Sequence, residues 1–276
     1  MTLDPMKAIR LLAAGLAAGA CLAPAAADDW ARPVLVSGPG IEAQARDVGQ
    51  SSASEYGEGV LVSGQPYPGL FDTNVPGATR RAMADDLAFV KSIRGEDASD
   101  LHRRIFGAVD GPAYFKFFES RVKAVGLDPG PVDRGVMAYV RGFPAADYSK
   151  MWLTPNYVNY SMPQIERVEI IFHESRHTEM EHDFWHHAKC PNPFLDENGK
   201  PVHGVTTDDW MAGLAACDTT PYGSYGSALI MIKNIQKFCG NCTQKVKMDA
   251  GLYADDTLNR IIDPEARRAI KDDLYR

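Results

Sequence analysis

Two histidines four residues apart, His173 and His177, enclose a glutamate, Glu174, in the pattern H-E-x-x-H. Residues at that spacing lie on one face of an α-helix, so both imidazoles can bind one metal ion. A glutamate next to the first ligand can hold a metal-bound water and accept its proton. The pattern therefore predicts a zinc-dependent hydrolytic site with His173 and His177 as ligands and Glu174 as general base.

The segment around this pattern is predicted to be one long helix. Ser161 has the character of an N-cap residue, and Pro and Gln follow it in the first turn. Apolar residues then recur at roughly helical spacing from Ile165 to Phe184. Because proline disfavours helix in the residue before it, we expect the helix to end near Cys190. Three further histidines would then line the end of this helix, or bind metal adventitiously: His182, His186 and His187.

These residues resemble the H-E-x-x-H zinc metallopeptidases, the zincins. The resemblance implies an α+β fold that is mostly helical, with a small sheet beside a long metal-binding helix. Two positions depart from the family pattern, because Arg176 and Glu179 are charged where zincins usually carry uncharged or apolar residues. The same residues are also compatible with a charge-rich, solvated helix that binds no metal.

A catalytic zinc ion normally has three protein ligands and a water, so a third ligand is needed. The metzincin pattern would place a glycine and then a histidine further along the same run, where this chain has Met180 and Asp183. Glu181 shares the helical face of His177, but a straight helix rarely wraps three ligands round one ion. The third ligand is therefore expected elsewhere in the chain.

A later segment, 215–223, resembles the signature of the aspzincin (deuterolysin-like) peptidases. In that family an aspartate is the third zinc ligand and a tyrosine polarises the substrate carbonyl. By this resemblance Asp218 is the third ligand and Tyr222 or Tyr225 the electrophile. The spacing departs from the family by one extra residue between Asp218 and Tyr222, and no Gly-Thr precedes the aspartate. An Asx turn or a helix N-cap is the alternative role for Asp218, with Asp208 and Asp209 as reserve ligands.

Four cysteines follow the motif, an even number that favours two disulfides in an oxidising compartment. Our preferred pairing is Cys190 with Cys217 and Cys239 with Cys242, the second closing a CxxC after a predicted helix. A redox CxxC usually stands at the N-terminus of a helix, so a structural bridge is the better interpretation. A four-thiolate zinc site is the alternative.

The first residues have the pattern of an export signal. Lys7 and Arg10 precede an apolar run, 11–22, and the small residues 25–27 suit cleavage, so 1–27 is expected to be a signal peptide. The apolar run is too short to span a membrane as a helix. Ala18 replaces the larger apolar residue of a lipoprotein signal, which disfavours lipidation at Cys21. We therefore expect a secreted or periplasmic protein with no transmembrane segment after signal removal.

The formal net charge of −7 argues against a nucleic-acid surface. An irregular or mixed N-terminal region is expected over 28–110 and a helix-rich domain over 111–276. Strand-like runs lie at 33–37, 59–63, 135–141 and 150–153, and helical patterns at 78–93, 112–127, 210–216, 225–238 and 255–276, the last broken at Pro264.

The sequence as a whole predicts an exported zinc metallopeptidase that hydrolyses peptide bonds in a peptide or protein substrate. The alternative is a non-catalytic metal-binding or structural protein of the cell envelope with a coincidental or degenerate motif. Residues 174–177 also read Glu-x-x-His, as in di-iron bundles, but such a bundle needs a second such motif on another helix, and the sequence shows none outside the predicted helix that carries 174–177.

Overall fold

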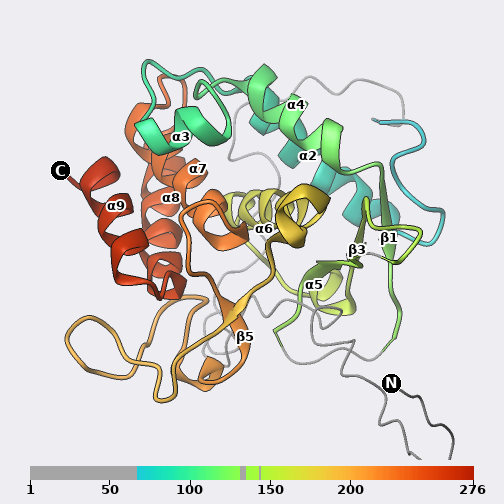
Figure 1. The fold of residues 1–276 in the computed structure, drawn as a ribbon. Coiled ribbons are helices and arrows are strands. Elements are labelled where there is room, and N and C mark those ends of the chain that lie inside the picture. Colours follow the sequence, from blue (N-terminus) through green and yellow to red (C-terminus); the bar gives the residue numbers. More distant parts are fainter. Residues whose placement is uncertain (1–66, 131–134, 143) are drawn as a thin grey trace, which may run out of the picture.

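The computed structural model describes residues 67–130, 135–142 and 144–276. The expected signal peptide and the strand-like runs at 33–37 and 59–63 lie outside these ranges. The described part is α+β, with helices making up about half of it and two small sheets beside them (Figure 1). This agrees with the coarse class expected from the sequence.

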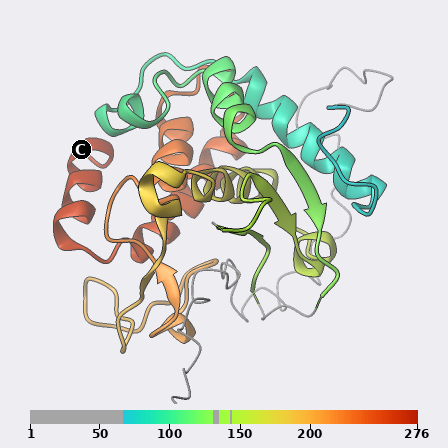
Figure 2. The same cartoon turned by 45° about the vertical axis from the view of Figure 1, so that its right-hand side comes forward.

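Helix α6 (Gln164–His177) lies at the centre of the helical layer (Figures 1 and 2). Helices α7 (Ser224–Phe238) and α8 (Gln244–Thr257) pack on one side of it, and α2 (Gly77–Ser92) and α4 (Gly111–Arg121) pack on another. All of α6 except Gln164 and Arg167 is buried, as expected of a helix enclosed by others. The H-E-x-x-H segment therefore lies on the most enclosed helix of the described structure.

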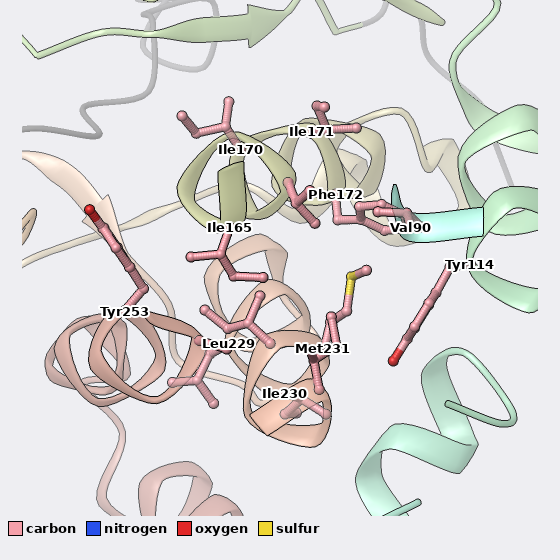
Figure 3. Packing of buried hydrophobic residues seen from close by; sticks show 14 of the residues in the cluster. Val90, Tyr114, Ile165, Ile170, Ile171, Phe172, Leu229, Ile230, Met231 and Tyr253 are labelled. Carbon is pink, nitrogen blue, oxygen red and sulfur yellow. The ribbon is translucent and has the colours of Figure 1, made fainter. Parts of the chain in front are cut away.

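Apolar side chains of α6 and α7 face each other in the core (Figure 3). Ile165 and Phe172 of α6 and Leu229 of α7 are buried to 2% exposure or less. The Phe172 ring also meets Tyr114 and Phe117 of α4, with ring centroids 5.9 Å apart in both pairs. Burying one such side chain stabilises the folded state by roughly 1.5–3 kcal/mol. This packing therefore holds α6 in place, together with the residues at its C-terminal end.

The larger sheet has the order β1-β3-β2, with β1 (Ala124–Leu127) parallel and β2 (Ala138–Val140) antiparallel to β3 (Lys150–Leu153). The prediction of strands at 135–141 and 150–153 is confirmed, the first one shorter than expected. The predicted helix 112–127 is wrong in its second half. There the chain leaves α4 after Arg121 and pairs with β3, because the ladder gives residues 124–127 backbone partners and buries the two central residues of the strand.

The predicted continuous helix to Cys190 is also wrong. Helix α6 begins at Gln164, with Pro163 rather than Ser161 at its N-cap, and it ends at His177. The irregular 3₁₀ segment η1 (Met180–Trp185) follows, and three of its residues have left-handed backbone. Buried hydrogen bonds and ion pairs of Glu179 favour this irregular segment over a continued helix, despite the apolar residues at helical spacing.

The chain then runs into β4 (Ala188–Lys189), which pairs antiparallel with β5 (Ala215–Cys217). The helix predicted at 210–216 is therefore only the short η2 (Asp209–Met211) followed by β5. The helices predicted at 78–93 and 225–238 are confirmed to within one residue as α2 and α7. The remaining elements are α3 (Asp100–Ile105), α5 (Pro155–Asn159), η3 (Leu258–Arg260) and α9 (Pro264–Leu274).

Side-chain caps explain where several helices begin. Four helices are preceded by an N-cap residue whose side chain accepts a hydrogen bond from a backbone N–H of the first turn: Ser99, Thr154, Thr243 and Asp263. Pro264 opens α9 at the position where its missing N–H costs nothing. None of the helices in the described ranges has the length and apolar character needed to cross a membrane.

Candidate metal centre

Three histidine nitrogens converge at the C-terminal end of α6. The Nε2 atom of His177 lies 3.1 Å from that of His173 and 3.0 Å from that of His187, and the third side of the triangle is 3.2 Å. In a tetrahedral zinc site with Zn–N bonds of about 2.0–2.1 Å, ligand nitrogens lie about 3.3–3.4 Å apart. The triangle is therefore close to the size that one bound metal ion requires.

The second nitrogen of two of these rings is engaged by an acceptor. Nδ1 of His177 donates to the carbonyl of Phe184 at 2.9 Å, and Nδ1 of His187 donates to Oδ1 of Asp218 at 2.9 Å. In the tautomer protonated at Nδ1, an imidazole carries its lone pair on Nε2, and the Nε2 atoms of these two rings face each other. Such an arrangement is repulsive without a cation between them, and it is how metal-binding histidines are normally oriented.

Burial favours the neutral form that metal binding needs. The pKa values of His173 and His177 are held well below their usual range, first by desolvation and then by the neighbouring imidazoles. Both rings are almost fully enclosed. The pair therefore presents free nitrogen lone pairs at neutral pH.

Glu174 is completely buried, with 0% of its surface exposed. Neither of its carboxylate oxygens has a hydrogen-bond partner among the described residues. Desolvation raises the pKa of this carboxyl to about 8. Buried polar atoms nearly always have partners, so this carboxyl group, next to His173 in the chain, is a candidate for contact with a group that is not part of the chain.

Tyr225 covers two of the three imidazoles. Its ring centroid lies 4.3 Å from that of His173 and 4.5 Å from that of His187, and the Arg260 guanidinium lies 4.5 Å from it. Burial raises the pKa of its hydroxyl well above the usual range. Tyr222 is turned towards α3, where its hydroxyl accepts a hydrogen bond from Arg104 at 3.3 Å. Of the two tyrosines singled out in the sequence, Tyr225 is the one packed against the histidines.

Asp218 lies behind His187. Its Oδ1 binds the His187 ring, and its Oδ2 accepts the backbone N–H groups of Tyr225 at 2.8 Å and Gly226 at 3.2 Å. These amides belong to the first turn of α7, so Asp218 also caps that helix from a distance. The structure thus brings together the Nε2 atoms of His173, His177 and His187, and Asp218 binds the other ring nitrogen of His187.

Sequence reasoning did not place His187 beside the motif, although a signal for this position was present. The predicted pairing of Cys190 with Cys217 is confirmed, with 5.1 Å between the Cα atoms, and Ala188 faces Cys217 across the β4–β5 ladder. This pairing places the residue before Ala188 opposite the residue after Cys217, that is, His187 opposite Asp218. The second predicted bridge, Cys239 to Cys242, is also confirmed.

Two other groups of described residues bring possible ligand atoms within 4.8 Å of one another: Glu179 with Glu181 and His182, and His203 with Asp208 and Asp209. The oxygens of Glu179 are already bound by arginines and a tryptophan. The other group is largely exposed, which is common for acidic side chains that bind no ion. The histidine triangle is the strongest candidate among these groups.

Comparison with protein-family models, with curated proteins and with solved structures finds no match to this chain.

Proposed function

We propose that this protein is an exported, zinc-dependent peptidase in which His173, His177 and His187 hold the metal. The observation that carries this proposal is the convergence of three imidazole Nε2 atoms beside a buried carboxyl group without a hydrogen-bond partner among the described residues, Glu174. Imidazole nitrogens at this spacing suit a borderline-soft ion with tetrahedral preference, which favours zinc over calcium or magnesium.

A bound zinc ion would supply a Lewis acid and lower the pKa of a water molecule to about 7. Such a cation would also favour the ionised form of Glu174, whose oxygens could then act as general base towards that water and return the proton to the leaving amine. Asp218 keeps His187 in the tautomer that presents Nε2, and Phe184 does the same for His177 through its carbonyl. The Tyr225 ring holds two of the imidazoles in place.

Export is supported by the two disulfides, which form and persist in oxidising compartments. The charged and apolar pattern of residues 7–22 points to the same route. A secreted or periplasmic location is therefore part of the proposal.

A second candidate is a metal-binding protein without hydrolytic activity. The burial of the site favours it, because His173 is only 3% exposed and His177 only 9%. Structural zinc sites are closed, whereas catalytic ones keep a position for water. Glu174 separates the two candidates, since a purely structural site has no use for a buried carboxylate without a partner.

The test is hydrolysis of a quenched fluorescent peptide library by the zinc-loaded protein, wild type beside Glu174→Gln. The proposal predicts cleavage by the wild type and a loss of at least about 100-fold in the variant, which keeps its zinc. If both proteins bind zinc and neither cleaves any peptide, the non-catalytic metal protein is the correct assignment.

A further inference from the structure

The turn after α6 brings the third histidine back to the first two without the help of a glycine. Asp183, Phe184 and Trp185 have φ values of 53°, 57° and 49°, so three consecutive side-chain-bearing residues take up the left-handed conformation. That conformation costs free energy in any L-residue and persists only where the surroundings impose it. The turn delivers both the Phe184 carbonyl that orients His177 and, two residues after Trp185, His187.

Glu179 is bonded to this turn through both its backbone and its side chain. Its carbonyl accepts the N–H groups of His182 at 3.3 Å and Phe184 at 3.0 Å. Its Oε2 accepts the indole N–H of Trp185 at 2.8 Å. One residue therefore holds the turn at three points.

The other carboxylate oxygen of Glu179 fastens the turn to the helices. Oε1 accepts from Arg121 of α4 at 2.6 Å and from Arg176 of α6 at 2.5 Å. Arg176 also donates to the Tyr222 carbonyl and to the Ser227 hydroxyl of α7, both at 3.0 Å. The Glu179 side chain is 4% exposed, so these charge-assisted bonds are shielded from water.

We propose that Glu179 is the positioning residue of the metal centre, because it fixes the left-handed turn that places His187 and orients His177. This inference rests on the proposed metal site and identifies the contacts that bring His187 to the other two histidines. It also accounts for the two charged residues that depart from the zincin pattern: Arg176 and Glu179 pair with each other instead of facing solvent. The bonds of Glu179, and not a glycine, thus stabilise the left-handed backbone of the turn.

The experiment measures Zn²⁺ affinity by competition with a chromophoric chelator, and the absorption spectrum of the Co²⁺-loaded protein. Glu179→Gln keeps the size of the side chain and removes its charge. Glu181→Gln is the matched control, since Glu181 is exposed in the same segment. We expect Glu179→Gln to bind Zn²⁺ about 10–100-fold more weakly, with a changed Co²⁺ spectrum, and Glu181→Gln to match the wild type.

Trp185→Phe provides a second variant should Glu179→Gln fail to fold. It removes one hydrogen bond to the turn and leaves both ion pairs intact, so we expect a smaller loss of Zn²⁺ affinity. A merely structural role for Glu179 would lower the melting temperature of the metal-free protein without changing Zn²⁺ affinity or the Co²⁺ spectrum, and that result would overturn the inference. A wild-type protein that takes up no Zn²⁺ would overturn the proposed function and the inference together.

Discussion

Asp218 joins the metal centre to the start of helix α7. Its Oδ1 lies 2.9 Å from Nδ1 of His187, while its Oδ2 accepts the backbone N–H of Tyr225 at 2.8 Å. A single buried carboxylate thus orients the His187 ring and caps a helix. The two roles can be separated by measuring metal affinity and stability on the same variant.

Asp218→Asn is expected to weaken Zn²⁺ binding by about 10–100-fold, because an amide is a poorer acceptor for His187 and cannot balance the charge of the bound ion. Stability of the metal-free protein should fall by about 1 kcal/mol, the usual worth of an N-cap interaction. Asp209→Asn, at an exposed position in η2, is the control. Unchanged Zn²⁺ affinity in Asp218→Asn would contradict the orienting role.

The two disulfides should have different effects on the metal centre. The bridge from Cys190 to Cys217 closes a separation of 27 residues, for which loop entropy gives about 3–4 kcal/mol. Replacing both cysteines by serine should lower stability by roughly that amount and weaken Zn²⁺ binding, since β4 no longer holds His187 opposite Asp218.

The bridge from Cys239 to Cys242 spans a separation of 3 residues and should contribute about 2 kcal/mol. Its double serine variant is the matched control, with lower stability and unchanged Zn²⁺ affinity of the folded protein. Equal losses of affinity in the two double variants would show that the first bridge has no special link to the site.

Tyr225→Phe should retain both Zn²⁺ binding and most peptide hydrolysis, because the ring that covers His173 and His187 is preserved. Tyr225→Leu removes the ring and should weaken Zn²⁺ binding by about tenfold. Steady-state kinetics on the zinc-loaded variants provide the check. A Tyr225→Phe enzyme with full zinc and a strongly reduced kcat would instead support the electrophilic role expected from the aspzincin resemblance.

A buried acid on α6, Glu166, gives the protein a pH-dependent stability. Burial raises its pKa from 4.5 to about 7, opposed by the Tyr253 hydroxyl and by Arg167, and Asp256 raises it further. The folded state therefore holds a proton that the unfolded state has lost. The contribution of Glu166 to the free energy of unfolding is therefore largest below about pH 4.5. It falls as the pH rises towards 7, by at most about 1.4 kcal/mol per pH unit.

Glu166→Gln removes this titration while the amide oxygen can still accept the Tyr253 hydroxyl. Urea unfolding of the two metal-free proteins at pH 5 and pH 8 should show the variant gaining stability relative to wild type at the higher pH. Glu119→Gln, an exposed carboxyl on α4, should give parallel curves. A constant difference between wild type and Glu166→Gln across this range would disprove the shift.

The motif itself could be predicted from local pattern, because His173, Glu174 and His177 lie on one helix whose periodicity fixes their common face. His187 could not be found this way. Its position depends on a turn with left-handed backbone at Asp183 and its two neighbours, and helical spacing says nothing of such a turn. One of the residues that bind Glu179 beside this turn is Arg121, 58 residues earlier in the chain, and a local pattern gives no sign of such a contact. Asp218 was predicted as the third ligand from the aspzincin resemblance, and its contact with the His187 ring became visible only in the structure.

The most direct test of the three-histidine site is the zinc content of untagged protein after Zn²⁺ loading and desalting. Wild type is compared with His187→Ala and with His186→Ala, the adjacent histidine as matched control. The proposed site predicts about one zinc per chain in wild type and in His186→Ala, and a large loss in His187→Ala. A wild type without zinc, or a His187→Ala variant that retains it as firmly as wild type, would contradict the site described here.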